Sequence, residues 1–120
     1  MKSNELKTQL TDGETLLFIH KGTIMKGERV SGYLALTNQR LIWEKGGLAN
    51  AVGLGLLSLV GTDYLSIPVT EIVSVSDYWI PAAAGLKLML KNGEELKFQL
   101  NGNKPKKARE EFHDCYNQQR

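Results

Sequence analysis

Two things are scarce in this chain: cysteine and net charge. Its 120 residues include one cysteine, Cys115, so an internal disulfide is excluded, which is typical of proteins from a reducing compartment. The formal net charge is only +2. A dedicated nucleic-acid binder usually has a strong basic excess, so the sequence predicts no nucleic-acid partner. The hydrophobic content of 42% and charged content of 23% are ordinary for one globular domain.

Long apolar runs are also lacking. The first seven residues mix both charges and have no apolar stretch, which predicts no secretion signal. The longest uncharged run covers residues 46–62, and its strongly apolar part, residues 48–60, is shorter than the roughly 20 residues of a helical span. These features predict a cytoplasmic protein, with peripheral contact to a membrane surface as an open alternative.

No constellation of catalytic or metal-binding residues is visible. The chain has no nucleophile triad in supporting context, no glycine-rich phosphate loop and no cluster of metal ligands. His20 falls on a predicted strand and His113 on a predicted helix, where structural roles are expected. Cys115 lies on an apolar helical stripe and should behave as a small hydrophobe. The sequence therefore predicts a non-enzymatic protein without catalytic residues, cofactor or metal.

Alternating apolar residues predict seven short strands. In the first strand, apolar residues on both sides indicate either burial on both faces or a strand that bends around a corner. The dipeptide Asn92-Gly93 predicts a two-residue type I′ turn between the last two strands, and residues 81–85 read as a connector. Pro68 suits an edge strand. The predicted strands cover residues 15–23, 30–37, 40–45, 64–69, 72–79, 86–91 and 96–101.

Helical periodicity appears at both ends of the chain. Leu6 and Leu10 suit a short leading helix. Near the end, Pro105 suits the first turn of a helix, and an apolar stripe follows it at helical spacing. The members of this stripe are Ala108, Phe112, Cys115 and Tyr116.

Short antiparallel strands followed by one amphipathic helix predict a mainly β fold. A curved sheet or open barrel, plugged at one end by the helix, would bury the apolar faces. The domain should cover residues 1–120, with residues 11–116 as its folded core. The predicted buried residues are Leu34, Leu36, Leu41, Trp43, Val73, Val75, Leu88, Phe98 and Phe112.

Two motifs resemble a known family. The first is Gly32-Tyr33-Leu34-Ala35-Leu36-Thr37-Asn38-Gln39-Arg40-Leu41-Ile42-Trp43, and the second is Ile67-Pro68-Val69-Thr70-Glu71-Ile72-Val73-Ser74-Val75. Both are similar to segments of GRAM domains and bacterial pleckstrin-homology-like domains. The resemblance covers residues 13–116 and implies a pleckstrin-homology-like curved antiparallel sheet of about seven strands capped by a C-terminal helix.

The resemblance also directs attention to basic residues. Pleckstrin-homology domains that bind phosphoinositides place a Lys late in the first strand and an Arg-x-Arg in the second, and Lys21, Lys26 and Arg29 occur in this region here. The second basic residue of the Arg-x-Arg is missing, because Val30 and Ser31 follow Arg29, and Glu28 dilutes the charge. These departures favour a solvated loop with scattered charges, with an anion or lipid site as the alternative. Arg40 follows the turn of the first motif and should tie that turn to carbonyl groups or to a carboxylate such as Glu71.

A second basic group opens the last helix. Cations are unfavourable at this positive end of the helix dipole, so the group either holds an anion or accepts a small, screened cost. Its members are Lys104, Lys106, Lys107 and Arg109.

Residues 47–62 form an uncharged insertion between the third and fourth strands. Three arrangements are open: extra core, an interface between copies, or a wedge at a bilayer interface. The last is disfavoured because few basic residues flank the segment. The predicted interface or membrane residues are Leu48, Val52, Leu54, Leu56, Leu57, Leu59 and Val60.

These observations predict an adaptor or scaffold module that binds a protein partner or itself as a homo-oligomer. The alternative is a peripheral membrane module that recognises anionic lipid through phosphoinositide-like head groups.

Overall fold

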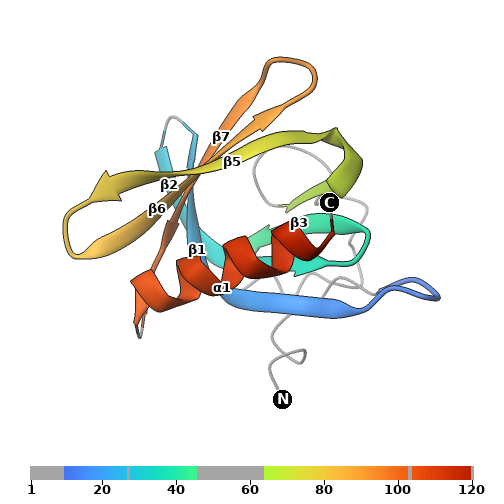
Figure 1. Ribbon diagram of the computed structural model, residues 1–120. Coiled ribbons are helices and arrows are strands. Elements are labelled where there is room, and N and C mark those ends of the chain that lie inside the picture. The colour runs from blue at the N-terminus through green and yellow to red at the C-terminus, as the bar shows by residue number, and fades with distance from the viewer. Residues whose placement is uncertain (1–9, 27, 46–63, 103, 120) are drawn as a thin grey trace.

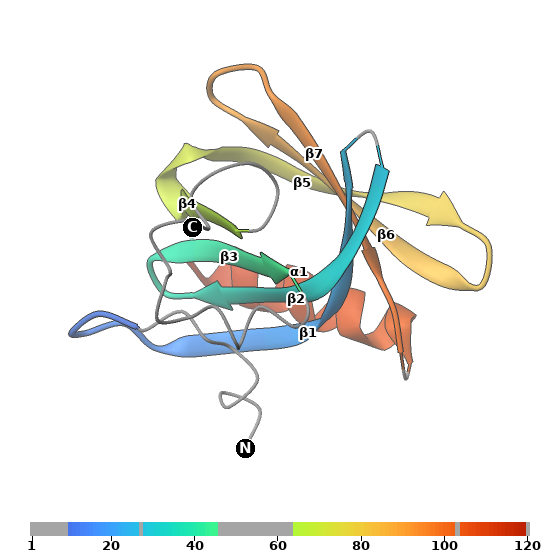
Figure 2. The same cartoon turned by 180° about the vertical axis from the view of Figure 1, so that it is seen from behind.

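A computed structural model describes residues 10–26, 28–45, 64–102 and 104–119. The predicted leading helix and the apolar insertion of residues 47–62 lie outside these residues, so both stay predictions. The described part contains a seven-stranded antiparallel sheet and one α-helix (Figures 1 and 2). The strand order across the sheet is β4-β3-β2-β1-β7-β6-β5.

The elements follow the predicted order closely. The 3-10 helix η3 joins β4 to β5, and the two-residue turn Pro81-Ala82 joins β5 to β6. The bounds are β1 Leu16–Lys26, β2 Glu28–Thr37, β3 Arg40–Lys45, β4 Tyr64–Pro68, η3 Val69–Glu71, β5 Ile72–Ile80, β6 Ala83–Leu90, β7 Glu95–Leu100 and α1 Pro105–Gln118. Pro68 ends β4, which is an edge strand as predicted, because an edge position tolerates the missing backbone donor.

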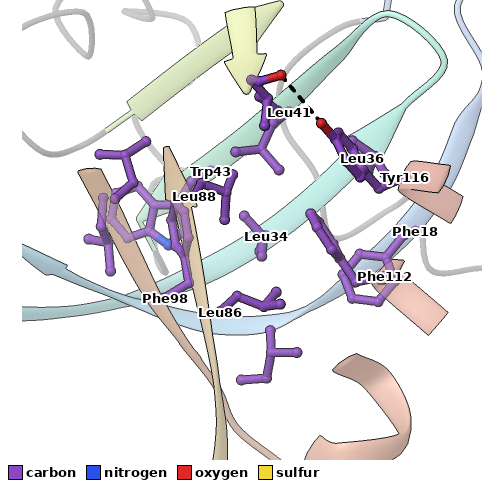
Figure 3. Packing of buried hydrophobic residues seen from close by; sticks show 14 of the residues in the cluster. Phe18, Leu34, Leu36, Leu41, Trp43, Leu86, Leu88, Phe98, Phe112 and Tyr116 are labelled. Carbon is purple, nitrogen blue, oxygen red and sulfur yellow. Dashed lines mark hydrogen bonds between the residues drawn. The ribbon is translucent and has the colours of Figure 1, made fainter. Parts of the chain in front are cut away.

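The main core lies between the curved sheet and α1 (Figure 3). Phe112 of α1 is fully buried and packs edge-to-face on Phe18 of β1, with ring centroids 5.3 Å apart. One turn later, the Tyr116 hydroxyl donates a hydrogen bond of 3.3 Å to the Ile72 carbonyl oxygen. The buried indole of Trp43 donates a 3.0 Å hydrogen bond to the Gly22 carbonyl oxygen. The predicted helical plug is therefore confirmed.

A second, smaller cluster lies on the other face of β1, β2 and β3. It consists of Ile19, Ala35 and Ile42, with partly buried apolar neighbours around them. Phe18 and Ile19 are adjacent in β1 and point to opposite faces, since successive side chains of a strand alternate. The prediction that the first strand is buried on both faces is thus confirmed.

Most of the predicted core is buried, but Val73 is not. Its side chain is 56% exposed, whereas Ile72 is buried and Val75 packs against the core. The pairing of β5 with β6 shifts register between Ile72 and Ser74, which marks a β-bulge. The bulge inserts one residue into the alternation, so Val73 faces outward, and the prediction that it shares a face with Val75 is wrong.

Two connections also differ from the prediction. Residues 83–85 are not a connector, because β6 begins at Ala83 and only Pro81 and Ala82 form the turn after β5. The loop after β6 is longer than predicted: the Gly93 N–H donates to the Leu90 carbonyl, and within this loop only Gly93 has a positive φ, at 89°. This is a type I turn closed by a left-handed glycine, and not a two-residue type I′ turn.

The turn between β2 and β3 is held by a carboxylate, although not the one suggested. Arg40 Nε donates to Glu14 Oε2 at 2.8 Å, and its Nη1 donates to the Ser66 hydroxyl at 3.0 Å. The Thr37 hydroxyl donates to the same Glu14 oxygen at 2.6 Å. Arg40 is therefore structural, as predicted, but its partner is Glu14 and not Glu71, because the segment before β1 returns to this turn.

Candidate functional site

A polar groove lies on the face of the sheet opposite the main core. In the β1–β2 pair, Lys21 opposes Tyr33, Thr23 opposes Ser31, and Met25 opposes Arg29. These alternate residues share one face, since successive strand residues point to opposite sides. The core-facing residues between them, such as Ile24 and Leu34, are buried. Folding therefore places basic and hydroxyl side chains together on the outer face.

The groove has a volume of about 580 Å³. Three strands contribute to it, because β7 pairs with β1 on the side away from β2. Among the described residues that line it, the charged side chains are both cationic and there is no carboxylate. The lining residues are Lys21, Thr23, Arg29, Ser31, Gly32, Tyr33, Gln99 and Asn101.

Side-chain amides organise the β7 side of the groove. The Asn101 amide nitrogen donates to the Thr23 hydroxyl at 2.7 Å, and the Gln99 amide nitrogen donates to Asn101 Oδ1 at 2.9 Å. Among the described residues, Gln99 Oε1 is a buried acceptor left without a hydrogen-bond partner. The groove thus has a fixed polar lining that retains one unpaired acceptor.

The two cations of the groove sit on different strands. Lys21 and Arg29 are both exposed. The stem of Lys21 lies beside Gly102, where its Cδ would be 3.8 Å from an added Cβ. Lys26 ends β1, and its side chain lies outside the described part of the structure. Of the three basic residues singled out in this region, the fold therefore brings Lys21 and Arg29 to one groove.

The basic group at the start of α1 divides into two parts. Arg109 is tied to the sheet: its Nε lies 3.5 Å from Asp77 Oδ1, and its Nη1 donates to the Gly85 carbonyl at 3.3 Å. Lys104, Lys106 and Lys107 are exposed and make no ion pair within residues 10–26, 28–45, 64–102 and 104–119. Three exposed ammonium groups are thus available to a partner on this surface.

The histidines and the cysteine have local partners. His20 shares a hydrogen bond with the Asn101 carbonyl, and His113 contacts the Asp77 carboxylate. Burial raises the pKa of the Cys115 thiol, and the charges of Glu111 and Asp114 raise it further. A thiol with a raised pKa is a poor nucleophile near neutral pH.

Within the described residues, no group of three or more metal-ligating side chains lies together.

Sequence reasoning missed three residues of this region. Gln99 and Asn101 reach the groove only because β7 pairs with β1, and the local sequence pattern of neither strand predicts this pairing. The sequence pattern places Trp79 only at the end of a strand, whereas the structure shows that it is 81% exposed. Its exposure could have been predicted from its position directly before Ile80-Pro81, because a strand that ends in apolar residues next to a turn places them at the edge of the sheet.

Two solved structures share this architecture. The C-terminal domain of an unknown protein from Leishmania infantum superimposes with a TM-score of 0.61 at 16% sequence identity, covering 87% of this chain and 85% of that chain. The Vps36 N-terminal PH domain superimposes with a TM-score of 0.60 at 14% identity, covering 89% of this chain and 85% of that chain. The fold is pleckstrin-homology-like. The predicted fold class is therefore confirmed.

The likeness to these structures concerns the fold alone. No family model and no curated protein matches the sequence. Membership of the GRAM family therefore stays a prediction. None of the helices in the described residues has the length and hydropathy needed to cross a membrane.

Proposed function

We propose that this pleckstrin-homology-like chain is a non-enzymatic binding module that recognises an anionic, phosphate-bearing ligand in the Lys21–Arg29 groove. One observation carries the proposal: two cations from neighbouring strands line a groove whose described lining residues include no carboxylate. Phosphorylated lipid head groups are one source of such a ligand, which is the alternative function predicted from the sequence. Free phosphorylated metabolites are another source.

The spacing of the cations suggests what the ligand looks like. Arg29 pairs with Met25, four residues along β1 from Lys21, so the two backbone positions are roughly 13 Å apart at ~3.3 Å per residue. A guanidinium binds phosphate through two parallel hydrogen bonds, whereas an ammonium acts as a point charge. Both long side chains can reach inward from the two ends of the groove. A ligand with two separated phosphates fits this arrangement.

The neutral part of the groove suits a polyol. Thr23 and Ser31 lie between the two cations along the β1–β2 pair, and Tyr33 and Gln99 add a hydroxyl and an amide to the same groove. Such groups both donate and accept hydrogen bonds, as sugar or inositol hydroxyls do. Gln99 Oε1 is short of a donor in the groove lining. A phosphorylated inositol combines the required charges and hydroxyl groups.

Calorimetry with a soluble inositol trisphosphate tests this function without a membrane. A charge-assisted hydrogen bond contributes about 1.5–3 kcal/mol, so Lys21→Gln with Arg29→Gln should weaken binding by about a hundredfold or more. Lys91→Gln is the matched control, because Lys91 is exposed in the loop after β6, away from the groove. Equal affinities for the wild type and the double variant would refute the proposal.

A protein-binding adaptor remains the second candidate. The observation that favours it is the edge strand β5, which carries Val73 with 56% of its side chain exposed. Edge strands offer unpaired backbone groups to a partner chain. The predicted self-association through residues 47–62 lies outside the described residues. If that segment joins copies, Leu56→Glu should lower the solution mass of an oligomer and leave a folded subunit, as light scattering and circular dichroism would show.

A further inference from the structure

The most exposed large apolar side chain of the described residues is Trp79, with 81% of its surface accessible. It stands at the end of β5, and the residues that follow are also uncharged: Ile80, then the turn residues Pro81 and Ala82. Pro81 and Ala82 are exposed, and Ala82 adopts a left-handed φ of 59°. Residues 79–82, called here the hairpin tip, therefore present an indole and a tight apolar turn to the surroundings.

Strand register fixes where the hairpin tip lies. Gly22 pairs with Leu100, Leu100 with Ala84, and Ala84 with Trp79, which makes one row across β1, β7, β6 and β5. The adjacent position on β1 is Lys21, whose carbonyl accepts a hydrogen bond from the Asn101 N–H. At about 4.8 Å between strands, Trp79 and the Lys21 end of the groove are roughly 14 Å apart. Both therefore lie at the same end of the sheet.

The start of α1 lies at this end too. Figures 1 and 2 show the β5–β6 turn and the first turn of α1 on the same side of the molecule. A hollow of about 280 Å³ separates them, lined on the strand side by Trp79, Ile80 and Ala83 and on the helix side by Lys106 and Arg109. The indole and the Lys106 ammonium thus border one depression. The hairpin tip with Lys104, Lys106 and Lys107 is called here the hairpin face.

The charge of the hairpin face is positive. Asp77 also lines the hollow, but it faces Arg109 at 3.5 Å and contacts His113, so its charge is directed toward α1. The lysines of the first turn are exposed and without an ion pair among the described residues. Their charge is complementary to an anionic surface. Each basic residue close to such a membrane surface adds to its attraction.

We propose that the hairpin face docks on an anionic lipid bilayer. Trp79 would enter the boundary between head groups and acyl chains, where amphipathic indole rings are favoured. Lys104, Lys106 and Lys107 would contact lipid phosphates around it. This goes beyond the groove, because it requires a bilayer and not a soluble head group. The two proposals can therefore fail separately.

A bilayer suits this surface better than a protein partner. The apolar part is confined to one short turn, whereas a stable protein interface usually buries about 800 Å² on each partner. Its border is made of flexible lysines, a residue type depleted from protein interfaces. Binding at a membrane interface increases with the buried apolar area and with the attraction of basic residues to anionic lipid, and this surface combines an exposed indole with neighbouring lysines.

Vesicle binding with fluorescence detection tests the proposal on the full chain. The chain has two tryptophans, and Trp43 is fully buried, so Trp79 should report the change. On vesicles of phosphatidylcholine mixed with phosphatidylserine, we expect a blue shift of emission and quenching by brominated acyl chains. Trp79→Ala lacks this reporter, so co-sedimentation with the vesicles measures its partition coefficient, which should be about tenfold or more below that of the wild type because the indole no longer enters the interface. Val73→Ala is the control, because Val73 is exposed at the other end of β5.

Charge reversal tests the lysines separately. Lys106→Glu with Lys107→Glu should also reduce the partition by about tenfold or more and remove most of its salt dependence. Phosphatidylcholine vesicles without anionic lipid should bind the wild type weakly. Calorimetry with soluble inositol trisphosphate reports on the groove in the same Trp79→Ala protein, so loss of vesicle binding with an intact groove supports the hairpin face.

Three outcomes would overturn the proposal. The first is the absence of vesicle binding by the folded wild type. The second is equal partition of the wild type and Trp79→Ala. The third is vesicle binding without quenching by brominated lipid, which would leave Trp79 outside the bilayer. Self-association of the wild type that Trp79→Ala abolishes, with no vesicle binding, would assign the hairpin face to a second copy instead.

Discussion

Arg40 Nε lies 2.8 Å from Glu14 Oε2, and this ion pair joins the segment before β1 to the turn between β2 and β3. A second bond of 3.1 Å links Arg40 Nη2 to the other carboxylate oxygen. The hydrogen bond from Arg40 is the main reason that the pKa of Glu14 falls to about 2, with bonds from Thr37 and Thr11 helping and burial opposing. The pair makes an otherwise exposed turn part of the folded framework.

The first prediction is an acid-dependent loss of stability. The pKa of Glu14 falls from 4.5 to about 2 on folding, so its contribution is fully present above pH 4.5 and is lost as the pH falls toward 2. A shift of this size corresponds to on the order of 3 kcal/mol. Urea midpoints of the wild type should fall over this window. Glu14→Gln should start lower and change less, and a wild-type slope in that variant would contradict the assignment.

The second prediction concerns the helical plug. Phe112→Ala should lower the free energy of unfolding by about 3–5 kcal/mol, because it empties a fully buried site against Phe18. Gln118→Ala is the control, since Gln118 is exposed near the end of the same helix. Chemical denaturation measures both. Similar midpoints for the two variants would show that α1 does not close the core.

The third prediction separates two uses of glycine. A Cβ at Gly32 would lie 1.9 Å from the Glu44 carbonyl oxygen, a clash with backbone in the neighbouring strand. Gly93 has open space around it but a φ of 89°. Gly93→Ala should therefore cost about 1–3 kcal/mol, and Gly32→Ala should cost more because β2 and β3 must separate. Thermal melting ranks the two, and a milder effect at Gly32 would contradict the close packing.

Much of the fold could be predicted because its patterns are local. The alternation around Leu88 and Phe98 defines two strands, and the spacing of Ala108, Phe112 and Tyr116 defines the buried stripe of α1. These patterns depend only on residues that are close in the sequence, so they can be read without knowing how distant segments pair. They sufficed for the architecture of a curved sheet closed by a helix.

The errors arose where pairing overrides local preference. Ala83 and Ala84 have little intrinsic strand preference, yet they continue β6 because Ile80 and Trp79 pair with them. The bulge that turns Val73 outward is a property of two strands and not of one. Glu14 was not recognised as the partner of Arg40 because the two are 26 residues apart.

The groove was only partly visible in the sequence. Lys21 and Arg29 are close along the chain, so their proximity could be anticipated from one hairpin. The amide side of the groove comes from β7, and Asn101 bonds Thr23 across 78 residues. Such a long-range pairing cannot be predicted from the sequence of either segment alone. The same holds for the neighbourhood of Trp79 and Lys106, which depends on how α1 returns to the sheet.

The most direct test of the central claim is a nuclear magnetic resonance titration of the full chain with soluble inositol trisphosphate. The account predicts saturable shifts of the backbone amides of Thr23, Ser31 and Gln99, which line the groove between its two cations. Amides of Asn92 and Gly93, in the loop after β6, should stay unchanged. Shifts that appear elsewhere and spare the groove, or no saturable shift at all, would contradict the proposal that this groove binds a phosphate-bearing ligand.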